Sequence, residues 1–186
     1  VTRDLVDLFA STERIAQHFH MPLQSGSDRI LGAMHRWYRA AHYAERVQLI
    51  RRLLPDAAIG ADVIVGFPGE SAADFQATAE FIERLPFTYL HVFSFSPRPG
   101  TAAASPGDPV PQEAVRERAR ALRALAQEKS AAFRRSQAGR TLRALTLHRQ
   151  GDNWTEALTG NYLKLRVSGR RPANEWCEVR VTADPQ

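Results

Sequence analysis

Strand-like and helix-like patterns alternate between residues 19 and 96 of the chain. Short apolar runs at residues 19–23, 59–67 and 89–96, bounded by turn-forming residues, are typical of strands. Apolar residues recur at helical spacing over residues 41–54 and 71–85, and a proline follows each run. Strands that alternate with helices predict parallel βαβ units, in either a doubly wound sheet or a barrel. The predicted fold class of this region is therefore α/β.

Capping residues mark the starts of two predicted helices. Ser27 or Asp28 can accept hydrogen bonds from the first backbone N–H groups of a short helix that contains Ile30. Ser71, followed three residues later by Asp74, forms a capping-box signature at the start of the 71–85 helix. Each of these helices therefore begins directly after the loop that follows a predicted strand.

The periodicity changes after a connector at residues 102–111 that contains three prolines. A long arginine-rich helix is predicted to reach about Gln137, where Gly139 can terminate it. Beyond it, apolar and polar positions alternate, which predicts a small antiparallel β-barrel. The alternating apolar positions are Leu145, Leu147, Leu163, Leu165, Val167, Cys177, Val179 and Val181. These patterns divide the chain into residues 1–137 and residues 138–186.

Composition and charge narrow the class of protein. The chain has 186 residues, of which 44% are hydrophobic, as in soluble globular proteins. Its one cysteine, Cys177, can neither form an internal disulfide nor hold an iron–sulfur cluster alone. Because we find no membrane-spanning run and no secretion signal, we expect a cytoplasmic protein that does not bind membranes. Residues 1–108 carry 10 basic and 12 acidic side chains, whereas residues 109–186 carry 15 and 8, so the positive charge is concentrated in the C-terminal part.

Candidate ligand contacts follow the predicted parallel strands. Ligands of parallel α/β folds bind at the carboxyl ends of the strands, which is where Gln24, Ser25, Gly66 and Arg98 fall. Amide and hydroxyl groups can hydrogen-bond a ribose or an amino acid group, glycine permits close backbone approach, and arginine can pair with a carboxylate or phosphate. Strand-ending turns contain such residues without any ligand as well, and the spacing alone favours that plainer interpretation.

Asp62 and two histidines are polar residues at strand positions. A carboxylate inside a β-branched strand is costly unless it is partnered, so Asp62 is either a ligand contact or half of a buried ion pair. His18 and His20 would point to one face of a strand and could supply two metal ligands, but the sequence offers no third ligand cluster beside them. A histidine pair satisfied within the core is the favoured interpretation, and we predict no metal site.

Aromatic and basic residues share one face of two predicted C-terminal strands. Tyr162, Lys164 and Arg166 alternate with apolar residues, and Trp176 and Arg180 form a similar face on the last strand. An aromatic ring interleaved with cations can stack on a base while the cations neutralise phosphates. A solvated sheet face is the alternative interpretation. The positive charge of this region favours RNA binding.

Three segments resemble, in the right order, motifs of the methylthiotransferase family of radical S-adenosylmethionine (SAM) enzymes. They are HMPLQSGSD at residues 20–28, DVIVGFPGE at residues 62–70 and RPGTAA at residues 98–103. The resemblance implies that residues 1–137 form the second half of a partial (βα)6 barrel and that residues 138–186 form a TRAM domain, a small RNA-binding β-barrel. It also implies that SAM or the substrate base is surrounded by Gln24, Ser25, Asp62, Gly66 and Arg98, and that tRNA is faced by Tyr162, Lys164 and Arg166.

The resemblance implies a reaction and cofactors as well. Residues 90–93 and 158–164 look most like the branch that methylthiolates C2 of N6-threonylcarbamoyladenosine at tRNA position 37. Close alternatives are relatives that modify isopentenyladenosine in tRNA or an aspartate of a ribosomal protein. The family uses SAM and two 4Fe-4S clusters bound by cysteines, three of them in a CxxxCxxC motif, that this chain lacks. We therefore expect a C-terminal portion of such an enzyme, inactive alone; a self-contained RNA-binding module is the other alternative.

The absence of half a barrel would leave the strand at residues 19–23 without a neighbour. Such an edge exposes backbone donors and acceptors that can pair with another chain. The partners expected from the sequence are therefore tRNA, the missing N-terminal half of the parent chain, and a second copy of this chain through the exposed edge.

Overall fold

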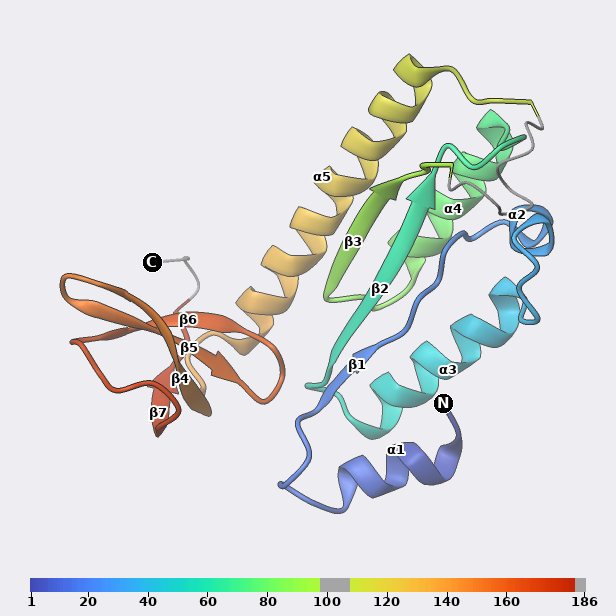
Figure 1. The fold of residues 1–186 in the computed structure, drawn as a ribbon. Helices are drawn as coiled ribbons and strands as arrows, with labels where there is room; N and C mark the ends of the chain where they lie inside the picture. Colours follow the sequence, from blue (N-terminus) through green and yellow to red (C-terminus); the bar gives the residue numbers. More distant parts are fainter. Residues whose placement is uncertain (98–107, 183–186) are drawn as a thin grey trace.

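The computed structural model describes residues 1–97 and 108–182, so the predicted ligand residue Arg98 lies outside the described residues. A parallel sheet with its helices forms the N-terminal part, and a long helix leads from it to an antiparallel sheet (Figure 1). The elements are α1 (Arg3–Ala10), β1 (His18–His20), α2 (Asp28–Ala33), α3 (Ala40–Leu53), β2 (Ala58–Val65), α4 (Ala72–Arg84), β3 (Tyr89–Ser94), α5 (Gln112–Gln137), β4 (Thr141–Gly151), β5 (Trp154–Thr159), β6 (Lys164–Ser168) and β7 (Trp176–Arg180).

Three parallel strands form the first sheet, in the order β1–β2–β3. The strands lie in the sheet in the same order as in the sequence, and Asp62 of β2 is level with His91 of β3. The predicted α/β class and parallel pairing are confirmed for this sheet. β1 is shorter than predicted because the chain after it leaves regular pairing: Gln24 has a φ of 69° and meets Val63 only in an isolated bridge.

One face of the parallel sheet carries the main core. Alternate residues of β2, such as Ile59, Ala61 and Val63, are fully buried in one cluster with residues of the surrounding helices. Val47 and Ile50 of α3 belong to this cluster and lie at helical spacing, as the sequence predicts. Each large apolar side chain buried in this way stabilises the fold by about 1.5–3 kcal/mol. The other, partly open face of the sheet carries Asp62 and the exposed histidines His20 and His91.

Helix α1 is absent from the sequence-based prediction. Thr2 caps the helix and Val6 is fully buried. The centroids of the Phe9 ring and of the Phe19 ring in β1 are 4.5 Å apart. Leu5, Val6, Leu8 and Phe9 recur at helical spacing, although Leu5 and Leu8 are exposed. The helix has only 8 residues, so its periodicity is a short signal.

The predicted starts and ends of the other helices agree with the structure. The capping box of α4 is confirmed, because the Ser71 hydroxyl accepts from the Asp74 backbone N–H at 3.2 Å and the Asp74 carboxylate accepts from the Ser71 N–H at 2.9 Å. Ser27 caps α2, and α5 ends at Gln137 as expected. Within residues 1–97 and 108–182, none of the helices combines the length and apolar character needed to cross a bilayer.

Four antiparallel strands form the second sheet, in the order β6–β5–β4–β7. The sheet curls around a small apolar cluster, and a register shift in β4 between Thr146 and Gln150 bends that strand. β6 and β7 are its two edges and do not pair with each other in the described part of the chain. The sheet is therefore a half-barrel here, where the sequence predicted a closed barrel.

The apolar face of β4 differs by one residue from the prediction. The sequence places Leu145 and Leu147 on that face, but Ala144 and Thr146 are the fully buried residues, and the two leucines are half-buried. The buried Thr146 hydroxyl donates to the Pro172 carbonyl at 2.7 Å, which offsets its desolvation. Hydrophobicity alone therefore assigns the wrong face.

A polar cluster joins the two sheets. Asp56, just before β2, forms an ion pair with Arg140 and accepts a hydrogen bond from the Gln137 amide at 3.1 Å. The Asn161 amide donates to the Asp56 backbone carbonyl and to the Gln137 side-chain oxygen, both at 3.2 Å. The hydrogen bond from Arg140 lowers the pKa of the Asp56 carboxyl below its usual value. Because Gln137 and Asn161 are buried and satisfied, this cluster fixes how the antiparallel sheet sits beside β1 and β2.

Candidate functional site

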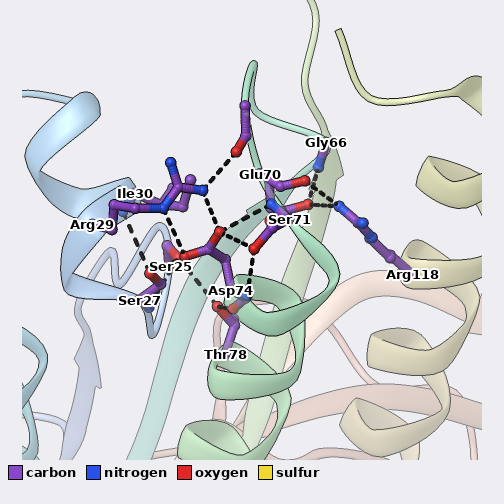
Figure 2. Close-up of polar contacts among 11 residues, drawn as sticks. Ser25, Ser27, Arg29, Ile30, Gly66, Glu70, Ser71, Asp74, Thr78 and Arg118 are labelled. Carbon is purple, nitrogen blue, oxygen red and sulfur yellow. Dashed lines mark hydrogen bonds and ion pairs between the residues drawn. The ribbon is translucent and has the colours of Figure 1, made fainter. Parts of the chain in front are cut away.

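The loops that follow β1 and β2 meet helix α4 at the carboxyl edge of the parallel sheet (Figure 2). The Ser25 hydroxyl lies 3.1 Å from the Thr78 hydroxyl and accepts from the backbone N–H of Ser27 at 3.1 Å. The Gly26 N–H donates to the Thr78 hydroxyl at 3.0 Å, and a Cβ at Gly26 would lie 2.7 Å from the Thr78 Cα. The β1–α2 loop is therefore held tightly against α4.

The carboxylate of Asp74 is the centre of these loop contacts (Figure 2). It accepts from the Ser27 hydroxyl at 2.7 Å and from the Ser71 N–H at 2.9 Å, and it forms an ion pair with Arg29. The hydrogen bond from Arg29, followed by those from Ser71 and Ser27, holds the pKa of the Asp74 carboxyl well below its usual range despite burial. Arg29 also donates to the Gly69 carbonyl at 2.6 Å, so one guanidinium joins both loops.

A buried ion pair ties the β2–α4 loop to α5 (Figure 2). Arg118 donates to the Glu70 carboxylate at 2.6 Å, and the two side chains are 13% and 1% exposed. The same carboxylate oxygen accepts from the Gly66 N–H at 2.8 Å. Gly66 has a φ of 78°, and a Cβ there would lie 2.5 Å from the Val115 side chain of α5. Glycine is therefore required at this position for packing and backbone conformation.

Three predicted ligand residues lie at the carboxyl ends of adjacent strands. Gln24 and Ser25 follow β1, and Gly66 follows β2. The Ser25 hydroxyl and the Gly66 N–H are already hydrogen-bonded within the fold, in keeping with the plainer interpretation of strand-ending turns. The Gln24 amide makes no hydrogen bond within the described residues, so it is the member of this set whose donor and acceptor could serve a ligand.

Asp62 lies on the open face of the sheet between two histidines. Its Oδ1 is 3.1 Å from His20 Nε2 and 3.2 Å from His91 Nδ1. The sequence alone indicates that Asp62 needs a partner, and it identifies neither of these two. His91 comes from β3, and the strand register that places it beside Asp62 cannot be derived from local spacing. A histidine inside the third predicted strand is the only sequence signal for it.

The phenol of Tyr89 connects His20 with His18. Its oxygen is 2.6 Å from His18 Nε2 and 3.0 Å from His20 Nδ1. Burial raises the pKa of Tyr89 to about 12, so the phenol keeps its proton at neutral pH. Burial, followed by repulsion from His20, lowers the pKa of His18. The prediction of a histidine pair within the core is therefore wrong: His18 is half-buried and bonded to Tyr89, whereas His20 is exposed and also reaches Asp62.

Tyr162 lies at the junction of the two sheets. Its ring stacks on His18 with 4.0 Å between centroids and 6° between planes. It precedes β6, which begins at Lys164, and it has a φ of 65°. The predicted strand is therefore wrong at its start, because the left-handed backbone turns Tyr162 out of the alternation. Of the three predicted residues, Lys164 and Arg166 lie on the exposed face of β6.

A groove rich in arginine lies between the edge strands β6 and β7. Its volume is about 320 Å³, and it is lined by Leu165, Arg166, Val167 and Ser168 of β6, Glu178, Val179 and Arg180 of β7, and Arg134, Arg171 and Thr182. The predicted RNA-binding residues Arg166 and Arg180 thus face one hollow, joined by Arg134 and Arg171, which the sequence-based prediction does not include. Arg134 reaches the groove from the end of α5. Together the arginines of the lining make the groove suited to phosphate.

Two arginine–tryptophan pairs lie on the antiparallel sheet, and one of them includes Arg166 of the groove. The Arg166 guanidinium lies over the Trp154 ring at 4.5 Å, and that of Arg143 lies over the Trp176 ring at 4.3 Å. Trp176 is 59% exposed, so one of its faces is open to a ligand. The antiparallel sheet therefore offers both cations and an aromatic surface, the combination that single-stranded nucleic acid requires.

The N-terminal part is similar to a known protein family. Residues 1–82, which include β1, β2 and the loops of Figure 2, match the family model described as Radical SAM superfamily. Similarity to curated proteins extends over nearly the whole chain. A "tRNA-2-methylthio-N(6)-dimethylallyladenosine synthase" of Kineococcus radiotolerans is 43% identical over 93% of this chain and 32% of its own length. A "Threonylcarbamoyladenosine tRNA methylthiotransferase MtaB" of Aquifex aeolicus is 40% identical over 96% of this chain and 42% of its own length.

The similarity covers both sheets but only part of each relative. A second dimethylallyladenosine synthase, of Nocardia farcinica, is 42% identical over 99% of this chain and 36% of its own length. The chain thus spans about a third to two-fifths of the length of these curated relatives. Radical SAM chemistry depends on SAM and an iron–sulfur cluster. The single cysteine of this chain does not fit a cluster site, since such clusters need several thiolates.

Proposed function

We propose that this chain is the C-terminal portion of a radical SAM enzyme that adds a methylthio group to C2 of an N6-modified adenosine at tRNA position 37. The observation that carries this proposal is the similarity to relatives named for tRNA methylthiolation, at 40–43% identity across more than nine-tenths of the chain. That similarity includes the sheet with the arginine groove as well as the radical SAM match.

Two modified bases are candidates. Residues 90–93 and 158–164 favour N6-threonylcarbamoyladenosine, and the relative from Aquifex aeolicus carries that base in its name. N6-dimethylallyladenosine is the second candidate, because the relatives from Kineococcus radiotolerans and Nocardia farcinica are named for it.

Within this proposal the two sheets have separate roles. Residues 1–137 form the second half of a partial (βα)6 barrel; the parallel strands in sequence order, with helices on one face, support this arrangement. Residues 138–186 form a TRAM-like domain that binds tRNA, and the groove lined by Arg134, Arg166, Arg171 and Arg180 supports this role. Gln24 contacts SAM, and the two 4Fe-4S clusters are held by cysteines of the missing N-terminal half of the parent.

The same proposal assigns a partner to the edge of the parallel sheet. β1 has a neighbour on one side only, so its outer edge is open to the N-terminal half of the parent or, in its absence, to a second copy of this chain. We expect the isolated chain to self-associate at this edge. Analytical ultracentrifugation should detect a dimer, and a monomer at all concentrations would contradict the expectation.

Nucleoside mass spectrometry of tRNA tests the proposed function. A strain that lacks the gene should lose 2-methylthio-N6-threonylcarbamoyladenosine, accumulate its unthiolated precursor, and recover the methylthio group when the gene is restored. If 2-methylthio-N6-dimethylallyladenosine is lost instead, the substrate is the second candidate base. Unchanged levels of both methylthio nucleosides would refute the proposal.

A further inference from the structure

Three potential metal ligands converge on the open face of the parallel sheet. The three neighbouring strands contribute one ligand residue each: His20 from β1, Asp62 from β2 and His91 from β3. The ligand atoms, His20 Nε2, Asp62 Oδ1 and His91 Nδ1, all lie within 4.8 Å of one another. A pleated sheet points these side chains to one side, so the backbone itself preorganises the group.

The Asp62 carboxylate carries an unsatisfied atom at this point. Oδ1 is buried and has no hydrogen-bond partner among the described residues, although two imidazole nitrogens lie 3.1 and 3.2 Å away. The distances suit hydrogen bonds, but no hydrogen bond of acceptable geometry joins the oxygen to either nitrogen. Atoms that coordinate one ion at about 2.0–2.2 Å are themselves separated by about 3 Å or slightly more, and they point at the ion and not at each other. The observed geometry is that of a shared ion.

A second hydrogen bond fixes the orientation of His20. Its other ring nitrogen, Nδ1, lies 3.0 Å from the Tyr89 hydroxyl, which in turn lies 2.6 Å from His18 Nε2. If Tyr89 donates its proton to His18, it accepts one from His20 Nδ1, and Nε2 of His20 is left with a free lone pair. That unprotonated nitrogen then lies 3.1 Å from Asp62 Oδ1, and two lone-pair-bearing atoms this close repel each other unless a cation lies between them. Metal-binding histidines are held in this way by a second partner.

We propose that His20, Asp62 and His91 bind a divalent transition metal ion. Two imidazoles and one carboxylate suit Zn²⁺, Co²⁺, Fe²⁺ or Ni²⁺ and leave coordination positions open for water or a ligand on the exposed side of the sheet. The site uses no cysteine. It is independent of the proposed tRNA methylthiolation and of any iron–sulfur cluster.

Cobalt titration of the untagged full chain tests this site. Co²⁺ should bind one ion per chain with visible d–d absorption, and Zn²⁺ should displace it. Asp62→Asn and His91→Gln should each weaken Co²⁺ binding by at least about tenfold, and Tyr89→Phe, which removes the second hydrogen bond of His20, by about tenfold. Circular dichroism should show that these variants keep the fold.

Two controls separate this site from adventitious binding. His42→Gln changes an exposed histidine on α3, and Cys177→Ser removes the only thiol; both should leave the Co²⁺ affinity unchanged. Absence of Co²⁺ binding by the folded chain would overturn the proposal. Equal affinity in the wild type and in folded Asp62→Asn and His91→Gln would also overturn it, because the ion would then bind elsewhere.

Discussion

The ion pair between Glu70 and Arg118 should be essential for attaching α5 to the parallel sheet. In Arg118→Met, the Glu70 carboxylate, 1% exposed, loses its charged partner at 2.6 Å and keeps, among the described residues, the hydrogen bond from the Gly66 N–H at 2.8 Å. Methionine still packs against Phe75, over whose ring the Arg118 guanidinium lies at 5.6 Å. Removing one member of a buried pair leaves an uncompensated charge, so we expect a loss of about 3–5 kcal/mol in the free energy of unfolding.

Urea denaturation followed by circular dichroism measures this loss. Arg120→Met, on the exposed side of the same helix, is the matched control and should change the free energy of unfolding by less than about 0.5 kcal/mol. The double variant Glu70→Gln/Arg118→Met also removes the unpaired buried charge of Glu70, so it should be at least about 1 kcal/mol more stable than Arg118→Met alone. If Arg118→Met costs no more than Arg120→Met, the buried pair does not attach α5 and the reasoning fails.

Three further changes have definite expected outcomes. The folded-state pKa of the Asp74 carboxyl is depressed, so the carboxylate stabilises the fold above the unfolded carboxyl pKa, and this stabilisation is lost as pH falls from there toward the folded-state pKa. Asp74→Asn should therefore flatten the drop in unfolding free energy between pH 5 and 3. An unchanged drop would contradict this. Lys164→Ala/Arg166→Ala should weaken tRNA binding by the full chain. The slope of log K against log salt should also become shallower by about 0.7–0.9 for each phosphate that is no longer neutralised. Equal slopes for the wild type and the variant in filter binding would exclude this face as the tRNA-binding site. Gly66→Ala should destabilise the fold by about 2 kcal/mol or more in urea, with partial rescue by Val115→Ala, because its Cβ would lie 2.5 Å from that side chain.

Local signals in the sequence were sufficient for the elements that depend on local physics. The Ser71 and Asp74 capping box predicts the start of α4 because both hydrogen bonds lie within one turn. The apolar spacing of α3 and the β-branched run of β2 likewise predict elements that agree with the structure to within two residues at most. Helix α1 was missed because its apolar pattern, although helical in spacing, extends over only 8 residues.

The parts that were missed depend on long-range pairing. His91 meets Asp62 only through the register of β2 and β3, and the buried Thr146 hydroxyl is satisfied by backbone groups of Pro172 and Glu175, which lie 26 and 29 residues away. Tyr162 leaves its predicted strand face because a positive φ turns it toward His18 in the other sheet. Alternation of residue types carries none of this information. The family resemblance, in contrast, depended on contiguous motifs, and the radical SAM match over residues 1–82 agrees with it.

Transfer of an isotopically labelled methyl group tests the central claim most directly. The full-length parent, reconstituted under anaerobic conditions, is supplied with methyl-labelled SAM, a sulfur source and tRNA from the strain that lacks the gene. Nucleoside mass spectrometry should find the label in a methylthio group on C2 of the N6-modified adenosine, while the 186-residue chain alone, with its single cysteine, should release no 5′-deoxyadenosine. Cleavage of SAM by the parent without labelled methylthio-adenosine in the tRNA would contradict the proposed function.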